Sequence, residues 1–83
     1  MTPEIEDLMH FFQESRRAAD LSYRRWGLRL GITRQRMHQI VEHGVVGPAM
    51  ARKILGDMAD GPDSPFPEGV KETAQVLSRQ ILG

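Results

Sequence analysis

The stretch that decides the fold is RRWGLRLGITRQRMHQIVEHG, which runs from Arg24 to Gly44. Trp26 and Leu30 are four residues apart in this stretch and therefore share one face of a first predicted helix. Gly31 can adopt the left-handed conformation that ends a helix, and Thr33 is a good N-cap for the next one. The stretch therefore predicts two helices joined by a short glycine turn.

The second of these helices has two chemically different faces. Met37, Ile40 and Val41 recur at the spacing i, i+3, i+4 and form an apolar stripe. The other face carries polar side chains, most of them long: Arg34, Gln35, His38, Gln39 and Glu42. The major groove of DNA is wide enough for a short helix of this kind. When a preceding helix braces it, its polar side chains can contact the base edges there.

This arrangement resembles the phage repressor and Cro class of helix-turn-helix DNA-binding proteins. The resemblance is close from Leu21 to Gly44 and looser over the four-helix unit from Pro3 to about Met58. In that class a serine caps the first helix, a small residue lies at the helix crossing and a glycine makes the turn. This chain has Ser22, Gly27 and Gly31 at the same mutual spacing. The buried positions of the class are matched by Leu30, Ile32, Met37 and Ile40.

Two positions depart from the class. Tyr23 stands where a phosphate-binding glutamine is common, so this tyrosine is either a phosphate donor or part of the core edge. Gly27 stands where alanine is usual, and glycine lowers helix propensity by about 1 kcal/mol relative to alanine. The resemblance implies an all-α fold: a four- to five-helix lambda-repressor-like helix-turn-helix domain with a C-terminal helix.

The resemblance also implies which residues contact DNA. The candidates for base contacts lie on the outward face, near the N-terminal half of the second helix, and are Arg34, Gln35, His38 and Gln39. Arginine pairs best with guanine and glutamine with adenine. The candidates for phosphate contacts flank the motif and are Ser22, Tyr23, Arg24, Thr33 and Arg36. Phosphate contacts position the protein without reading the sequence.

Charge is segregated along the chain. Eleven basic and eleven acidic residues give a formal net charge of zero. Between Arg16 and Lys53, however, nine basic residues stand against Asp20 and Glu42, a local balance of +7. The first fifteen residues carry four acids and no base. A basic middle that coincides with the motif predicts contact with phosphates.

Helical patterns continue on both sides of the motif, and no strand is predicted. The expected helices cover about residues 2–19, 22–30 and 34–43, a fourth starting at Gly47-Pro48, and residues 68–82. The first opens at Thr2-Pro3-Glu4 with a cap and a first-turn proline. Their apolar faces contain Ile5, Leu8, Met9 and Phe12 in the first helix and Met50, Ile54 and Met58 in the fourth. We therefore expect a DNA-binding domain (residues 1–60), a Pro/Gly-rich linker (61–67) and a C-terminal helix (68–83).

The C-terminal helix carries an apolar stripe with the spacing of a helix–helix seam. Its members are Val70, Ala74, Leu77 and Ile81. We expect this stripe to form a homodimer, because the preceding linker lets the helix project and because one short recognition helix reads few base pairs. Two-fold symmetry would then require an inverted-repeat operator with half-sites about 34 Å apart. The alternative is that the helix folds back as a fifth core helix of a monomer.

Composition and spacing argue against several other functions. The absence of cysteine excludes a disulfide framework and a Cys-based zinc site. His38 and Glu42 are one turn apart but lack a third ligand, so no metal site is predicted. No catalytic constellation or cofactor motif is visible, so we expect neither enzymatic activity nor a cofactor. No apolar run approaches the roughly 20 residues that span a bilayer, and the acidic N-terminus is unlike a signal peptide. The expected location is therefore the cytoplasm. Trp26 belongs to the periodic apolar set and is expected in the core, not at a binding surface.

These patterns favour a sequence-specific regulator that binds double-stranded DNA, most simply a homodimeric repressor of the kind that phages and mobile elements use. Two alternatives stay open. The acidic ends, Met1–Ser15 and Ile54–Gly83, suit a protein-interaction module such as an antitoxin or an inhibitor of a host enzyme. The segment from Gly31 to Ile40 also resembles the sigma-factor domain that recognises the upstream promoter element.

Overall fold

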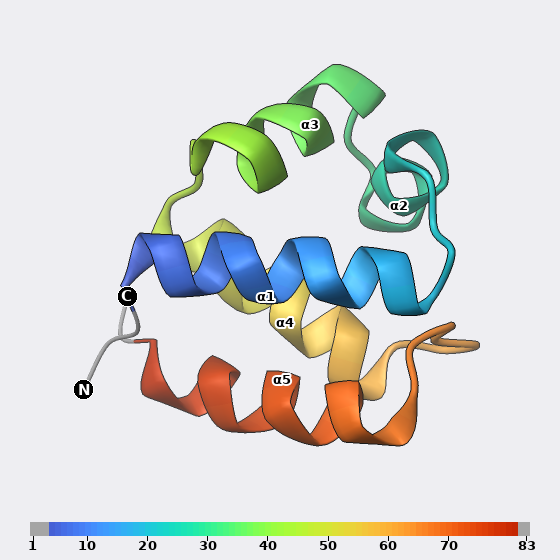
Figure 1. The fold of residues 1–83 in the computed structure, drawn as a ribbon, viewed down its shortest axis with the longest axis vertical. Coiled ribbons are helices and arrows are strands. Elements are labelled where there is room, and N and C mark those ends of the chain that lie inside the picture. Colours follow the sequence, from blue (N-terminus) through green and yellow to red (C-terminus); the bar gives the residue numbers. More distant parts are fainter. Residues whose placement is uncertain (1–3, 82–83) are drawn as a thin grey trace.

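Five α-helices make up the described part of the chain, residues 4–81 of a computed structural model (Figure 1). They are α1 (Ile5–Ala18), α2 (Tyr23–Leu30), α3 (Arg34–His43), α4 (Pro48–Asp60) and α5 (Glu68–Gln80). No strand occurs in these residues, so the predicted all-α class is confirmed. The expected cap and first turn at Thr2 and Pro3, and the expected last helical residue, Leu82, lie outside the described residues.

The caps of α2 and α3 follow directly from the local sequence. The Ser22 hydroxyl accepts a hydrogen bond of 3.1 Å from the Arg25 backbone N–H, and the Thr33 hydroxyl accepts one of 3.0 Å from that of Arg36. Each bond satisfies one of the amides that a helix start leaves without an intrahelical partner. Gly31 ends α2 with a φ of 73°, a left-handed conformation that strongly favours glycine. Both caps and the glycine turn are as the sequence predicts.

Gly27 lies where the backbone of this turn passes closest to α2. A Cβ atom at Gly27 would lie 2.8 Å from the Ile32 carbonyl oxygen and 3.1 Å from that of Thr33. The resemblance placed Gly27 at a helix crossing, but the atoms that approach it belong to the segment leading into α3. The missing side chain therefore sets how closely α3 follows α2.

The core is centred on Trp26, which is fully buried, as its place in the periodic apolar set predicts. Phe12 meets the Trp26 ring edge-on with 6.0 Å between centroids, and Phe66 lies 5.6 Å from it. In Figure 1, α2 and α3 lie on one side of α1 and α5 lies on the other, with α4 behind. α4 packs along α5, and α3 packs on both α1 and α2. The core thus joins residues from all five helices.

Three residues expected in the core lie at its edge. Ile5 is 41 % exposed, because it belongs to the first turn of α1 and extends past the other helices, beside Gly44. Met9 and Met50 are half-buried. Ala51 and Leu55 complete the apolar face of α4 together with Ile54 and Met58.

Residues 61–67, expected to be a linker, pack against the helices. Phe66 is buried, and the Ser64 hydroxyl donates a hydrogen bond of 2.9 Å to the Met58 carbonyl oxygen. Arg29 of α2 donates to the carbonyl oxygens of Pro62 and Asp63, at 3.2 and 3.3 Å. The three prolines stiffen this connection, and the aromatic side chain between two of them anchors it to the core.

α5 uses its apolar stripe within the chain. Ala74 is fully buried and Ile81 is 4 % exposed, while Val70 and Leu77 are half-buried against the same core. Within one chain the stripe thus packs on the core, as in the fold-back alternative, and the homodimer stays a prediction. The physical reason is that a chain of 83 residues buries little apolar surface without this fifth helix.

Candidate nucleic-acid interface

The outer face of α3 borders an open hollow of about 510 Å³. Its lining consists of Thr33, Arg34, Gln35 and His38. The last three are exposed side chains from the first half of α3, and Thr33 caps that helix. Three of the four predicted base-contact residues therefore surround one hollow. Gln39, the fourth, is exposed on the same helix but is not part of the lining.

The buried face of α3 determines this orientation. Met37 and Ile40 are fully buried and Val41 is nearly so, which leaves the polar residues no direction other than outward. The hollow contains an arginine that donates several hydrogen bonds, a glutamine amide that both donates and accepts, and an imidazole. No acidic residue lines it. These are donor-rich groups of the kind that pair with base edges in a major groove.

Four of the five predicted phosphate contacts are at least partly exposed. Ser22 and Thr33 use their hydroxyl oxygens as caps, which leaves the hydroxyl hydrogens able to donate. Arg24 is exposed and Arg36 is half-buried. Within residues 4–81, neither guanidinium is engaged in an ion pair. The starts of two helices, with their unpaired amides, provide further donors nearby.

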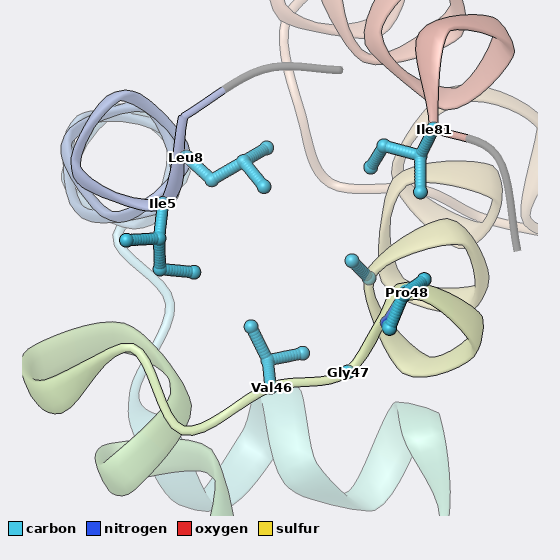
Figure 2. Close-up of a pocket in the computed structure, with 7 residues that line it drawn as sticks. Ile5, Leu8, Val46, Gly47, Pro48 and Ile81 are labelled. Carbon is cyan, nitrogen blue, oxygen red and sulfur yellow. The ribbon is translucent and has the colours of Figure 1, made fainter.

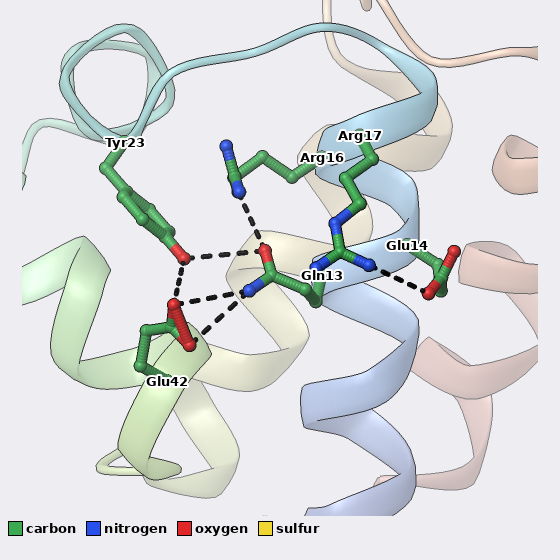
Figure 3. Close-up of polar contacts among 6 residues, drawn as sticks. All are labelled: Gln13, Glu14, Arg16, Arg17, Tyr23 and Glu42. Carbon is green, nitrogen blue, oxygen red and sulfur yellow. Dashed lines mark hydrogen bonds and ion pairs between the residues drawn. The ribbon is translucent and has the colours of Figure 1, made fainter.

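Tyr23, the fifth, is engaged in a polar cluster that joins three helices (Figure 3). Its hydroxyl donates a hydrogen bond of 3.0 Å to the Glu42 carboxylate. The Gln13 amide donates to both oxygens of that carboxylate, at 3.3 and 3.4 Å, and Arg16 Nε donates to the Gln13 carbonyl oxygen at 2.9 Å. A phenol has one hydrogen to donate, and here Glu42 accepts it. The geometry therefore supports the core-edge interpretation of Tyr23 over the phosphate-donor one.

The environment of the cluster also shifts the pKa values of Tyr23 and Glu42. Burial is the main cause that raises the pKa of Tyr23, and the hydrogen bond from Tyr23 is the main cause that lowers the pKa of Glu42. The Arg16 guanidinium lies 4.4 Å from the centre of the Tyr23 ring, a cation–π contact. The imidazole of His38 meets the same ring edge-on at 5.2 Å. The second half of α3 is thus tied to α1 and α2 through Glu42 and His38.

This cluster could not be predicted from the sequence. Gln13 and Glu42 are 29 residues apart and Tyr23 and Glu42 are 19 apart, so no helical periodicity links them. In the sequence, Arg16 is distinguished only by its positive charge. The one usable signal was the replacement of a common glutamine by Tyr23, which leaves a long hydroxyl-bearing side chain in need of a partner.

Not all nine basic residues between Arg16 and Lys53 present their charge at the surface, because Arg29 faces inward. Its Nε and Nη2 atoms donate to the two oxygens of Asp57, at 3.2 and 3.3 Å, in a bidentate pair with both side chains about one fifth exposed. Arg17 forms an exposed ion pair of 3.4 Å with Glu14 (Figure 3). Two of the nine basic residues, Arg17 and Arg29, are therefore paired with carboxylates, while Arg24, Arg25, Arg34 and Arg36 are grouped on α2 and α3.

Comparison of the chain with protein-family models, with curated proteins and with solved structures found no match. Within residues 4–81, no group of three or more potential ligands is placed to hold a metal ion. No helix in the same part of the chain has the length and apolar character to cross a membrane. The fold and this surface thus define a small all-α protein that presents a polar, basic helix face.

Proposed function

We propose that this chain is a sequence-specific regulator of transcription that binds double-stranded DNA through a lambda-repressor-like helix-turn-helix unit, with α2 as the bracing helix and α3 as the recognition helix. The observation that carries the proposal is the hollow along the exposed face of α3, which collects Arg34, Gln35 and His38. Its donor-rich, acid-free lining suits base edges, and the helix itself is short enough to enter a major groove.

In this mechanism α3 lies in the major groove. Arg34 pairs with the two acceptors of a guanine and Gln35 with the donor and acceptor of an adenine. Ser22, Arg24, Thr33 and Arg36 contact the phosphates and set the position of α3. The cluster around Glu42 holds the helix in that position against α1 and α2. Occupancy alone represses transcription, because a protein bound over a promoter excludes the polymerase.

The proposal is tested by selection from a random duplex pool, followed by titration of the selected site at several salt concentrations. We expect a defined consensus and a linear fall of log affinity with log salt concentration. With about three to five phosphates neutralised per copy, affinity should drop by roughly 10- to 10³-fold per copy between about 50 and 200 mM salt. A pool without a consensus, or an affinity indifferent to salt, would favour the protein-interaction alternative instead.

A further inference from the structure

Two hollows in the described part of the chain differ in their chemistry. The smaller one, of about 140 Å³, lies where α1 begins and α5 ends, and only apolar side chains line it (Figure 2). The larger one, which we call the α3 hollow, is lined by Arg34, Gln35, His38 and the cap residue Thr33. Of the two, only the α3 hollow offers side chains that form hydrogen bonds with a ligand. Its selectivity depends on how those side chains are oriented.

His38 is the member of this lining that ring contacts hold in place. Its imidazole meets the phenol ring of Tyr23 edge-on, with 5.2 Å between centroids and 75° between planes. Edge-to-face ring pairs at such distances are favourable beyond the apolar area that they bury. The imidazole of His43, further along α3, lies 5.8 Å from that of His38. Within residues 4–81, Arg34 and Gln35 have neither a ring contact nor a side-chain hydrogen bond.

Tyr23 can hold His38 because its own ring is fixed from several sides. The ring is half-buried and packs against the core. The Arg16 guanidinium of α1 lies 4.4 Å from the ring centroid. The hydroxyl donates to the Glu42 carboxylate at 3.0 Å and lies 3.4 Å from the Gln13 amide oxygen (Figure 3). The core and Arg16 therefore support the ring in a way that does not depend on the hydroxyl.

The orientation of His38 matters because this side chain is exposed, and an exposed side chain loses freedom when it binds. Fixing one rotamer-rich side chain at an interface costs about 2- to 10-fold in affinity. A side chain that already has its bound orientation in the free protein avoids most of this cost. The two nitrogens of His38 form no hydrogen bond among the described residues, so the imidazole keeps its capacity to donate and accept toward a base edge.

We propose that Tyr23 is a positioning residue for DNA recognition, whose ring holds the His38 imidazole in the orientation that reads a third base pair. This inference rests on the proposed function, and it replaces the predicted phosphate contact of Tyr23 with a role inside the protein. The ring performs this role, whereas the hydroxyl makes the hydrogen bond to Glu42 that joins α2 to α3. Substitutions can separate the two parts of the side chain, because phenylalanine keeps the ring and leucine removes it.

The first experiment measures the ring positions by NMR in the purified full chain without DNA. Nuclear Overhauser effects should connect the ring protons of Tyr23 with those of His38, because the two ring centroids are 5.2 Å apart. Tyr23→Phe should keep these connections, and Tyr23→Leu should remove the ring-current contribution of residue 23 from the chemical shifts of His38. A wild-type chain whose two rings show no such effect would overturn the proposal, whether or not the chain binds DNA.

The second experiment measures affinity for the selected duplex site and for each single-base-pair change in it. His38→Ala should lose the preference at one base pair, by about 5- to 100-fold. Tyr23→Leu should reduce the preference at that same base pair by about 2- to 10-fold, and Tyr23→Phe should keep it. Added to His38→Ala, Tyr23→Leu should cause no further loss there, because a positioning residue acts only through the side chain that it positions. Leu28→Ala is the matched control, since Leu28 lies on the same helix as Tyr23 and is 71 % exposed.

The possible outcomes separate this inference from the proposed function. If Tyr23 acts only through its hydrogen bond to Glu42, Tyr23→Phe and Tyr23→Leu will weaken binding alike at every base pair, and the positioning role is refuted. A loss in Tyr23→Leu that adds in full to that of His38→Ala refutes it as well. If Tyr23→Leu does not fold, Tyr23→Phe decides: retention of the preference at the His38 base pair supports the proposal, and its loss overturns it. A chain that selects no DNA sequence overturns the proposed function and this inference with it, whereas a selected site with an unchanged Tyr23→Leu profile overturns this inference alone.

Discussion

Two glycine-to-alanine substitutions should have different effects on stability, although both lie inside helices. At Gly56 in α4, a new Cβ would meet no atom within 4 Å. At Gly27 in α2, it would lie 2.8 Å from the Ile32 carbonyl oxygen and 3.1 Å from that of Thr33. Both of these contacts are with backbone, which cannot rotate away as a flexible side chain would.

The magnitudes follow from two opposing effects. Alanine is favoured over glycine in a helix interior by about 1 kcal/mol, and this gain applies at both positions. Gly56→Ala should therefore stabilise the fold by about 1 kcal/mol. At Gly27 the close approach adds an overpacking cost of about 1–3 kcal/mol, so Gly27→Ala should be neutral to destabilising by about 2 kcal/mol. The difference in free energy of unfolding between the two variants therefore measures the cost of the close contact at Gly27.

Urea unfolding followed by the fluorescence of Trp26, the one tryptophan of the chain, measures both free energies. We expect Gly56→Ala to be more stable than the wild type, and Gly27→Ala to be as stable as the wild type or less stable. If Gly27→Ala were as stabilising as Gly56→Ala, the turn could not run as close to α2 as the structure has it. The orientation of α3, and with it the proposed recognition surface, would then be wrong.

Three further substitutions test other contacts. Arg29→Met should destabilise the fold by about 1.5–3 kcal/mol, because it leaves the Asp57 carboxylate without its bidentate partner, and Arg29→Lys should recover only part of this loss in urea unfolding. Ser15→Ala should raise stability by about 1 kcal/mol, seen as a melting temperature higher by roughly 4–8 °C, because the buried Ser15 hydroxyl has no hydrogen-bond partner within the described residues. The pKa of Glu42 is lowered from 4.5 in the folded state. This carboxylate therefore stabilises the fold above its ordinary pKa, and its contribution disappears as the pH falls through the lowered value. Glu42→Gln should accordingly lose less stability than wild type between about pH 5 and pH 3, and equal losses would show that the Tyr23–Glu42 hydrogen bond is not made.

The parts of the fold that depend on neighbouring residues could be predicted from the sequence. Ser22, Thr33 and Gly31 act through bonds and dihedral angles within a few residues of themselves, so their roles are visible in the local pattern. The bounds of α3 followed for the same reason. The exposed direction of Arg34 and Gln35 could also be predicted, because a helix that buries Met37, Ile40 and Val41 has only one face left.

The parts that the sequence did not reveal depend on residues far apart in the chain. Nothing in the spacing of Arg29 and Asp57 indicates that the arginine turns inward and ties residues 61–64 to α2. The stripe of α5 has the same pattern whether it meets a second copy or the chain's own α4. The burial of Ala74 and Ile81 in the chain's own core therefore could not be predicted from that pattern.

A base-pair profile tests most directly whether Arg34 and Gln35 read bases. In this measurement the affinity of the wild type, of Gln35→Ala and of Arg34→Ala is determined for the selected site and for every single-base-pair change in it. Glu72→Gln, on the exposed face of α5, serves as the control. We predict that each variant loses about 1–3 kcal/mol on the selected site and loses its preference at one base pair, a guanine for Arg34 and an adenine for Gln35, while other positions keep theirs. Profiles of both variants that match the wild type at every base pair would contradict the proposal that α3 is the recognition helix.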